Sequence, residues 1–181
     1  VEVVAAEFST ELTYLPVLQK LHTIRAEGRL VIAAGAGSVE LTMYLVRQGS
    51  VASAEVADAA AEKGHLKCLQ YLHSIRCPWQ KSTCFAAARG GHIDCLRFAI
   101  SNGCDWSKEF IGHSAASGGD LPCLQYVAEK GCALEKAMLT KAGIAGAIDC
   151  VEYLHSKNVP FSDSFVYEMV CADSKQCLQF A

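Results

Sequence analysis

The chain has 181 residues, of which 51% are apolar and 19% are charged, and this composition excludes an intrinsically disordered chain. The formal net charge of -3 gives no general attraction to nucleic acid or to an anionic membrane surface, so we expect neither as a partner. Glu40 and Arg47 interrupt the most apolar stretch, which therefore lacks the ~20 uninterrupted apolar residues of a membrane-spanning helix. We expect no direct membrane insertion.

Residues 1–13 match nothing else in the chain and predict a leading helix or an irregular arm. From residue 14 onward one sequence word returns, first after 24 residues and then every 27 or 28, most clearly as Gly64–Trp79, Gly91–Trp106, Gly119–Leu134 and Gly146–Phe161. Val17, Leu41, Cys68, Cys95, Cys123, Cys150 and Cys177 occupy the same place in successive words. This period predicts a single repeat array over 14–181. Because the chain starts without methionine and stops inside a word, we expect the array to continue beyond residue 181.

Each word carries a helical pattern. In 93–100 the apolar residues recur at three- and four-residue steps, with Asp94 and Arg97 on the other side, which predicts an amphipathic helix of about three turns. A shorter alanine-rich helix over 82–89 precedes it and ends at Gly90 and Gly91. The equivalent first helices are 56–62, 110–117, 138–145 and 165–172, and Ser53, Ser107 and Ser162 are suitable N-caps for three of them. Since neither helix can bury its apolar face alone, the pattern predicts an all-α solenoid of stacked antiparallel helix pairs.

The ten cysteines follow the repeat period instead of a disulfide pattern. Equivalent cysteines in neighbouring units of a solenoid lie roughly 10 Å apart, whereas a disulfide requires Cα atoms about 4.4 to 6.8 Å apart. The same holds for the series Cys77, Cys104 and Cys132 in the connecting loops. We therefore expect reduced, buried cysteines and an intracellular location, the cytoplasm first. An organelle stays open, because a targeting segment could precede Val1.

His65 with Cys68, and His92 with Cys95, have a spacing that could supply metal ligands from one helix. Each pair is only half of a tetrahedral zinc site, and its counterpart lies one repeat away. No phosphate-binding glycine loop, nucleophile elbow or carboxylate pair stands outside the repeat. The sequence thus predicts no metal, no cofactor and no catalytic residue, with the two histidines bonded to neighbouring backbone.

Residues 82–106 carry a family resemblance. Gly91, His92, Ile93 and Asp94, the apolar positions after them, and Asn102 and Gly103 resemble the ankyrin repeat, whose second helix has the form GHLEIVKLLLEHGADVN. The words CLQYLHSIRCPW resemble a divergent, short-unit ankyrin-like subtype found in protists, algae and large DNA viruses. The usual ankyrin unit has about 33 residues, and the shorter unit here implies that the family's β-hairpin fingers are reduced or absent.

The resemblance implies a module that binds another protein through a rigid repeat surface, without catalysis. In such proteins contacts come from the loop before the first helix and from its last exposed turn. Carried over by position, these are Glu62, Lys63, Gln80, Lys81, Arg89, Ser107, Lys108, Ser117, Glu135 and Lys136. An ordinary solvated charged face is the alternative for each of them. We expect Trp79, Trp106, Leu134 and Phe161, which recur at one place in the word, to cover the core.

Two other functions stay open. The array could be a fixed structural subunit of a large multiprotein assembly, which large exposed apolar patches on the outer helix faces would favour. It could also be a thiol- or metal-dependent enzyme or a redox sensor.

Overall fold

The computed structural model describes residues 26–108 and 110–172, and every regular element in these ranges is an α-helix. The first helices of successive pairs are α2 (Ala26–Gly35), α4 (Ala54–Glu62), α6 (Lys81–Arg89), α8 (Ile111–Gly118), α10 (Lys136–Ile144) and α12 (Phe165–Cys171). The second helices are α3 (Val39–Arg47), α5 (Leu66–Ser74), α7 (Ile93–Ser101), α9 (Leu121–Glu129) and α11 (Ile148–Ser156). The predicted arm over 1–13 and the words at Val17 and Cys177 lie outside the described residues.

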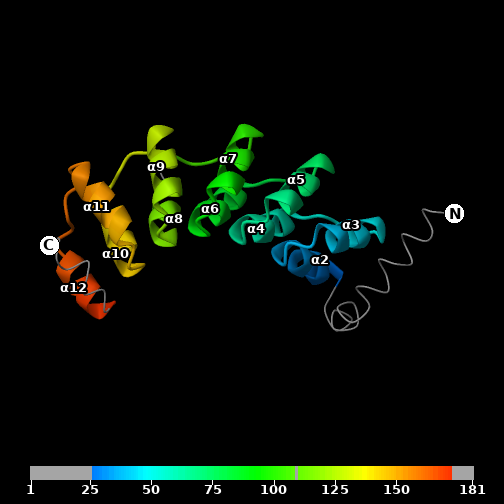
Figure 1. Ribbon diagram of the computed structural model, residues 1–181, viewed down its shortest axis with the longest axis horizontal. Helices are drawn as coiled ribbons and strands as arrows, with labels where there is room; N and C mark the ends of the chain where they lie inside the picture. The colour runs from blue at the N-terminus through cyan, green and yellow to red at the C-terminus, as the bar shows by residue number, and fades with distance from the viewer. Residues whose placement is uncertain (1–25, 109, 173–181) are drawn as a thin grey trace.

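The helix pairs stack side by side into an arch, with the first helices on its inner side and the second helices on its outer side (Figure 1). The first helices pack more closely on one another than the second helices do. Alanines such as Ala60, Ala87 and Ala115, all fully buried, permit this approach because a methyl group adds little to the helix radius. The predicted all-α solenoid is therefore confirmed.

A glycine in the left-handed conformation ends the first helix in each of the first five pairs, as Gly64 does after α4 with φ of 75°. The Gly64 N–H donates to the carbonyl of Ala61 at 3.2 Å, and the His65 N–H donates to that of Ala60 at 2.9 Å. Both carbonyls would otherwise lack a partner, so these two hydrogen bonds end the helix without leaving its last carbonyl groups unpaired. It turns the chain directly into the second helix.

Two local predictions are wrong. In four of the five complete described pairs the second helix is no longer than the first, as in α6 and α7, which both have nine residues. Ser53 is the N-cap of α4, but its hydroxyl makes no capping hydrogen bond. Ser107 and Ser162 precede their helices and accept hydrogen bonds through their backbone carbonyls instead. The predicted loss of the β-hairpin fingers is confirmed, since no strand occurs in the described ranges.

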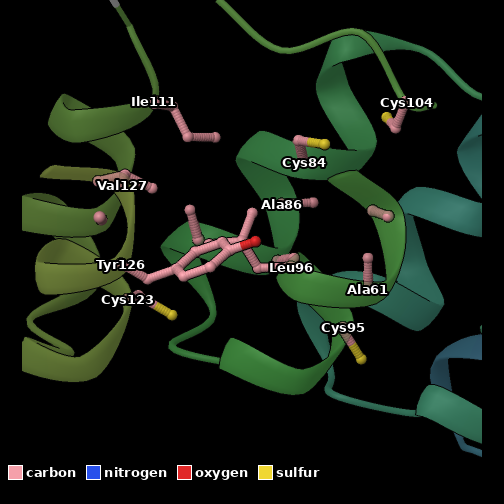
Figure 2. Close-up of a cluster of buried hydrophobic side chains, with 14 of the residues drawn as sticks. Ala61, Cys84, Ala86, Cys95, Leu96, Cys104, Ile111, Cys123, Tyr126 and Val127 are labelled. Carbon is pink, nitrogen blue, oxygen red and sulfur yellow. The ribbon is translucent and has the colours of Figure 1, made fainter. Parts of the chain in front are cut away.

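The core is continuous along the arch and lies between the two layers of helices (Figure 2). The repeated cysteines of the second helices are 0 to 1% exposed, which confirms their use as small apolar residues; they are Cys68, Cys95, Cys123 and Cys150. The bulky residues at the end of each word are half-buried and pack against this core, as predicted; they are Trp79, Trp106, Leu134 and Phe161. None of the described helices is long and apolar enough to cross a bilayer.

Candidate partner-binding surface

Six of the ten predicted contact residues lie along the N-terminal ends of three successive first helices. Gln80 is the N-cap of α6 and Lys81 its first residue, and Glu135 and Lys136 stand at the same places in α10. Ser107 and Lys108 lie in the loop before α8. All six are exposed except Ser107, which is half-buried. We call this row, together with Phe110, the loop edge.

The other four predicted residues lie at the opposite, C-terminal ends of the first helices. Glu62 and Lys63 close α4, Arg89 is the last residue of α6, and Ser117 lies in the last turn of α8. A nine-residue helix is ~13 Å long, so the ten residues form two separate rows along the arch instead of one patch.

Several charges in these rows are paired. The Arg89 guanidinium lies 3.0 Å from the Glu62 carboxylate of the preceding pair, and the Lys81 ammonium lies 3.3 Å from Asp105. Both pairs are exposed, and such pairs contribute only about 0–1 kcal/mol to stability. The Glu62–Arg89 bridge joins neighbouring units, so part of the row at the C-terminal ends serves the stack itself.

The loop edge contains an exposed aromatic residue that the sequence interpretation placed inside a helix. Phe110 is the N-cap of α8 and is 60% exposed. Its loop is one residue longer than the others: Ile111 follows Cys104 by seven residues, whereas Thr83 follows Cys77 by six. The single interval of 28 between Cys95 and Cys123 therefore reports an insertion at this loop, and it was the sequence signal that could have revealed Phe110.

The cysteines considered for metal binding are buried in the core, and one of the two histidines contacts the backbone. The His65 Nε2 atom lies 3.1 Å from the carbonyl oxygen of Gly35 in the preceding pair, as the predicted bond to backbone requires. Burial raises the pKa of both Cys95 and Cys150 to about 11, so these thiols stay protonated at neutral pH. In the described part of the chain, no three His, Cys, Asp or Glu side chains are placed to hold a metal ion.

The stack of short helix pairs, joined by glycine turns and packed most closely along one layer, defines the class of this protein as a helical repeat solenoid. No protein-family model and no curated protein sequence matches the chain. Among solved structures, the ankyrin repeat domain of human ASB11 has a TM-score of 0.60 and 19% sequence identity, covering 72% of this chain and 69% of that one. At this identity the likeness shows the fold, which is that of an ankyrin-like repeat protein.

Proposed function

We propose that the chain is a non-catalytic module that binds another protein, as a scaffold or a recruitment surface, through the loop edge. The observation that carries the proposal is the stack of first helices, which holds the side chains of successive units on one ordered backbone. A partner that binds such a surface does not have to supply the free energy of ordering it. Ankyrin-like folds generally serve protein interaction, and we propose no cofactor, metal or nucleic-acid ligand.

Phe110 is the contact residue on which the proposal depends most. Exposed aromatic side chains rarely stabilise the free protein, whereas buried aromatic anchors dominate the binding energy of many interfaces. Lys108 precedes Phe110 in the same loop, and Lys81 and Lys136 stand at the neighbouring helix ends. An apolar anchor with lysines on both sides suits a partner segment that carries an apolar side chain among acidic ones.

The alternative of a fixed subunit in a large assembly predicts apolar patches on the outer helices. In the described residues the large exposed apolar side chains lie mostly elsewhere: on α2, α10 and α12, and in loops or caps, with Ile75 at the end of α5 as the one on a second helix. This distribution favours an interaction through the inner layer and its edges. We propose a reducing intracellular compartment, the cytoplasm first, because eight of the nine described cysteines are buried free thiols.

The test compares binding of the loop edge with binding of the outer face. The immobilised chain captures partners from native lysate of its source cells, and the bound protein is quantified for Phe110→Ala and for Lys81→Ala/Lys108→Ala. We expect Phe110→Ala to weaken binding about 30-fold, as loss of a 2 kcal/mol anchor does, and the lysine pair to weaken it about 3- to 10-fold. Circular dichroism must show that both variants keep their helix content.

The matched control is Lys67→Ala/Arg97→Ala, which removes the same charge from exposed positions on the outer helices α5 and α7. We expect this variant to bind as the unaltered chain does. Equal retention of the partner by all three variants would show that the loop edge is not the contact surface. Insolubility of the isolated chain would favour the alternative of a fixed subunit.

A further inference from the structure

Two cysteines face each other across the third described helix pair. Cys84 lies in α6, and Cys104 lies in the loop that follows α7. Figure 2 shows their sulfur atoms pointing toward one another, and each thiol is close enough to shift the pKa of the other. Cys84 is fully buried and Cys104 is 5% exposed. Both are free thiols in this structure.

Cys77 and Cys132 occupy the same loop position as Cys104, but neither has a thiol opposite it. The Cys77 and Cys104 thiols donate to the carbonyls of Ser53 and Gln80, at 3.3 and 3.2 Å, just ahead of the first helix of their own pair. A Cβ atom on Gly112 would lie 2.7 Å from the Cys132 sulfur, so Gly112 is the counterpart of Cys84 in α8. The counterparts in α4 and α10 are Ala57 and Leu139.

The facing thiol changes the acidity of its partner. The interaction with the Cys84 thiol lowers the pKa of Cys104, although burial acts in the opposite direction. The interaction with Cys104, together with burial, raises the pKa of Cys84. Burial raises the pKa of Cys77 to about 11 and also raises the pKa of Cys132. Since the thiolate is the nucleophile in thiol chemistry, Cys104 is the loop cysteine best placed to react first.

We propose that Cys84 and Cys104 form an oxidation site, at which hydrogen peroxide closes a disulfide within one helix pair. The Cys104 sulfur attacks one peroxide oxygen, the O–O bond breaks, and the leaving hydroxide takes the Cys104 thiol proton, which gives a sulfenic acid and one water. The Cys84 sulfur then attacks the Cys104 sulfur, and the sulfenic oxygen leaves with the Cys84 proton as a second water. Two thiols lose two electrons and two protons, and one peroxide becomes two water molecules.

Closure of this disulfide alters the start of α6. The Cys104 S–H group that bonds the Gln80 carbonyl disappears, and the loop through Asp105 becomes covalently tied to the helix. Lys81 adjoins both changes, because it directly follows Gln80 and pairs with Asp105. The oxidation site does not depend on the proposed function, although it lies beside the loop edge.

Trypsin makes the site directly measurable, because Cys84 and Cys104 fall in different peptides, 82–89 and 98–108, each with a single cysteine. The folded, reduced chain is treated with hydrogen peroxide, its remaining thiols are alkylated, and the digest is analysed by mass spectrometry without reduction. We expect the two peptides to appear joined, with the mass of their sum less two hydrogens. Reduction after alkylation should release both peptides unalkylated.

Two variants separate the proposed pair from general oxidation. Cys84→Ala introduces the residue that α4 carries at the same position, Ala57, and should abolish the joined peptide while the thermal midpoint confirms folding. Cys77→Ser removes a loop cysteine that has no facing thiol and should leave the joined peptide unchanged. The proposal is overturned if both peptides stay separately alkylated, if Cys104 advances to a sulfinic acid with Cys84 still alkylated, or if peroxide joins other cysteine peptides at the same rate.

Discussion

At the scale of single residues, one contact explains why glycine and histidine stand together in the repeated word. The left-handed glycine that ends a first helix lies against a residue of the next helix pair. That residue is the one that directly follows the left-handed glycine of its own pair. Cβ atoms added to Gly37 and Gly64 would lie 2.5 Å from the rings of His65 and His92. The contacts down the stack are Gly37 with His65, Gly64 with His92, Gly91 with Asp120 and Gly119 with Ala147.

Gly64→Ala therefore combines two costs. The left-handed backbone costs an alanine about 1 kcal/mol, and the new methyl group displaces the His92 ring. The control Gly103→Ala carries only the first cost, because Gly103 has φ of 80° and open space around its Cβ position. We expect Gly64→Ala to lower the free energy of unfolding by about 1 kcal/mol more than Gly103→Ala does, measured by urea denaturation.

A second substitution checks the cause of this difference. Ala147 occupies the place of His92 two pairs along, so His92→Ala introduces a residue that the stack already accepts. The excess cost of Gly64→Ala should vanish in the His92→Ala background. An excess that persists there would show that the contact between pairs is not its source.

The sequence predicted part of this residue scale. The period made His65 a structural residue, and its bond to the backbone is confirmed, but the acceptor lies 30 residues back in the preceding pair. A pattern within one word cannot reveal contacts between words. Cys84 was missed for a related reason: a thiol stands at its position in only one of the described pairs, so it carries no periodic signal.

At the scale of helices, neighbouring first helices compensate for differences in side-chain size. Gly143 in α10 stands at the position that Ala116 has in α8. Met169 in α12 stands at the position that Ala142 has in α10. A Cβ atom on Gly143 would collide with the sulfur of Met169, which is fully buried. A smaller residue on one helix thus matches a larger one on the next, and the spacing between the helices is kept.

This matching predicts an effect whose sign depends on the neighbour. Gly143→Ala should lower the free energy of unfolding by about 1 kcal/mol or more, because the methyl group meets Met169. In the Met169→Ala background the same change should raise it by about 1 kcal/mol, because alanine is the better helix former. Chemical denaturation of the four proteins gives the coupling energy. A change of the same sign in both backgrounds would contradict direct packing between α10 and α12.

Helix boundaries could be predicted only in part. The glycines marked the ends of the first helices because a left-handed residue is needed there, and Gly90 and Gly91 were identified correctly. Serines were predicted to cap three of the starts, yet Ser53 makes no side-chain cap at α4, and the N-caps of α8 and α12 are Phe110 and Ser164. Packing between the pairs, which the sequence of one pair does not show, fixes where these helices begin.

At the scale of the molecule, each helix pair packs mainly on its neighbours. Leu96→Ala in α7 removes a fully buried side chain and should cost about 2–5 kcal/mol. In a linear stack this loss acts mainly on the altered pair and those beside it. Hydrogen exchange under native conditions should therefore show the largest loss of protection in α4 to α9 and the smallest in α2 and α12. An equal loss in every helix would indicate one indivisible folding unit.

The fold and the candidate site differ in how far the sequence predicts them. The period, the helix pairs and the buried cysteines were predictable because the repeated word restates them. The ten proposed contact residues were chosen by position, and the structure separates them into two rows. Phe110 was placed inside a helix because the extra residue in the 28-residue interval was not assigned to the loop before α8.

That slip has a consequence for recognition. A surface that repeats itself offers a partner several equivalent registers, one helix pair apart, and each competes with the others. The insertion before α8 occurs once among the described pairs, and it brings an exposed aromatic side chain to one place on the loop edge. One extra residue thus breaks the repeat symmetry of the loop edge. A partner that contacts Phe110 is then held in one register.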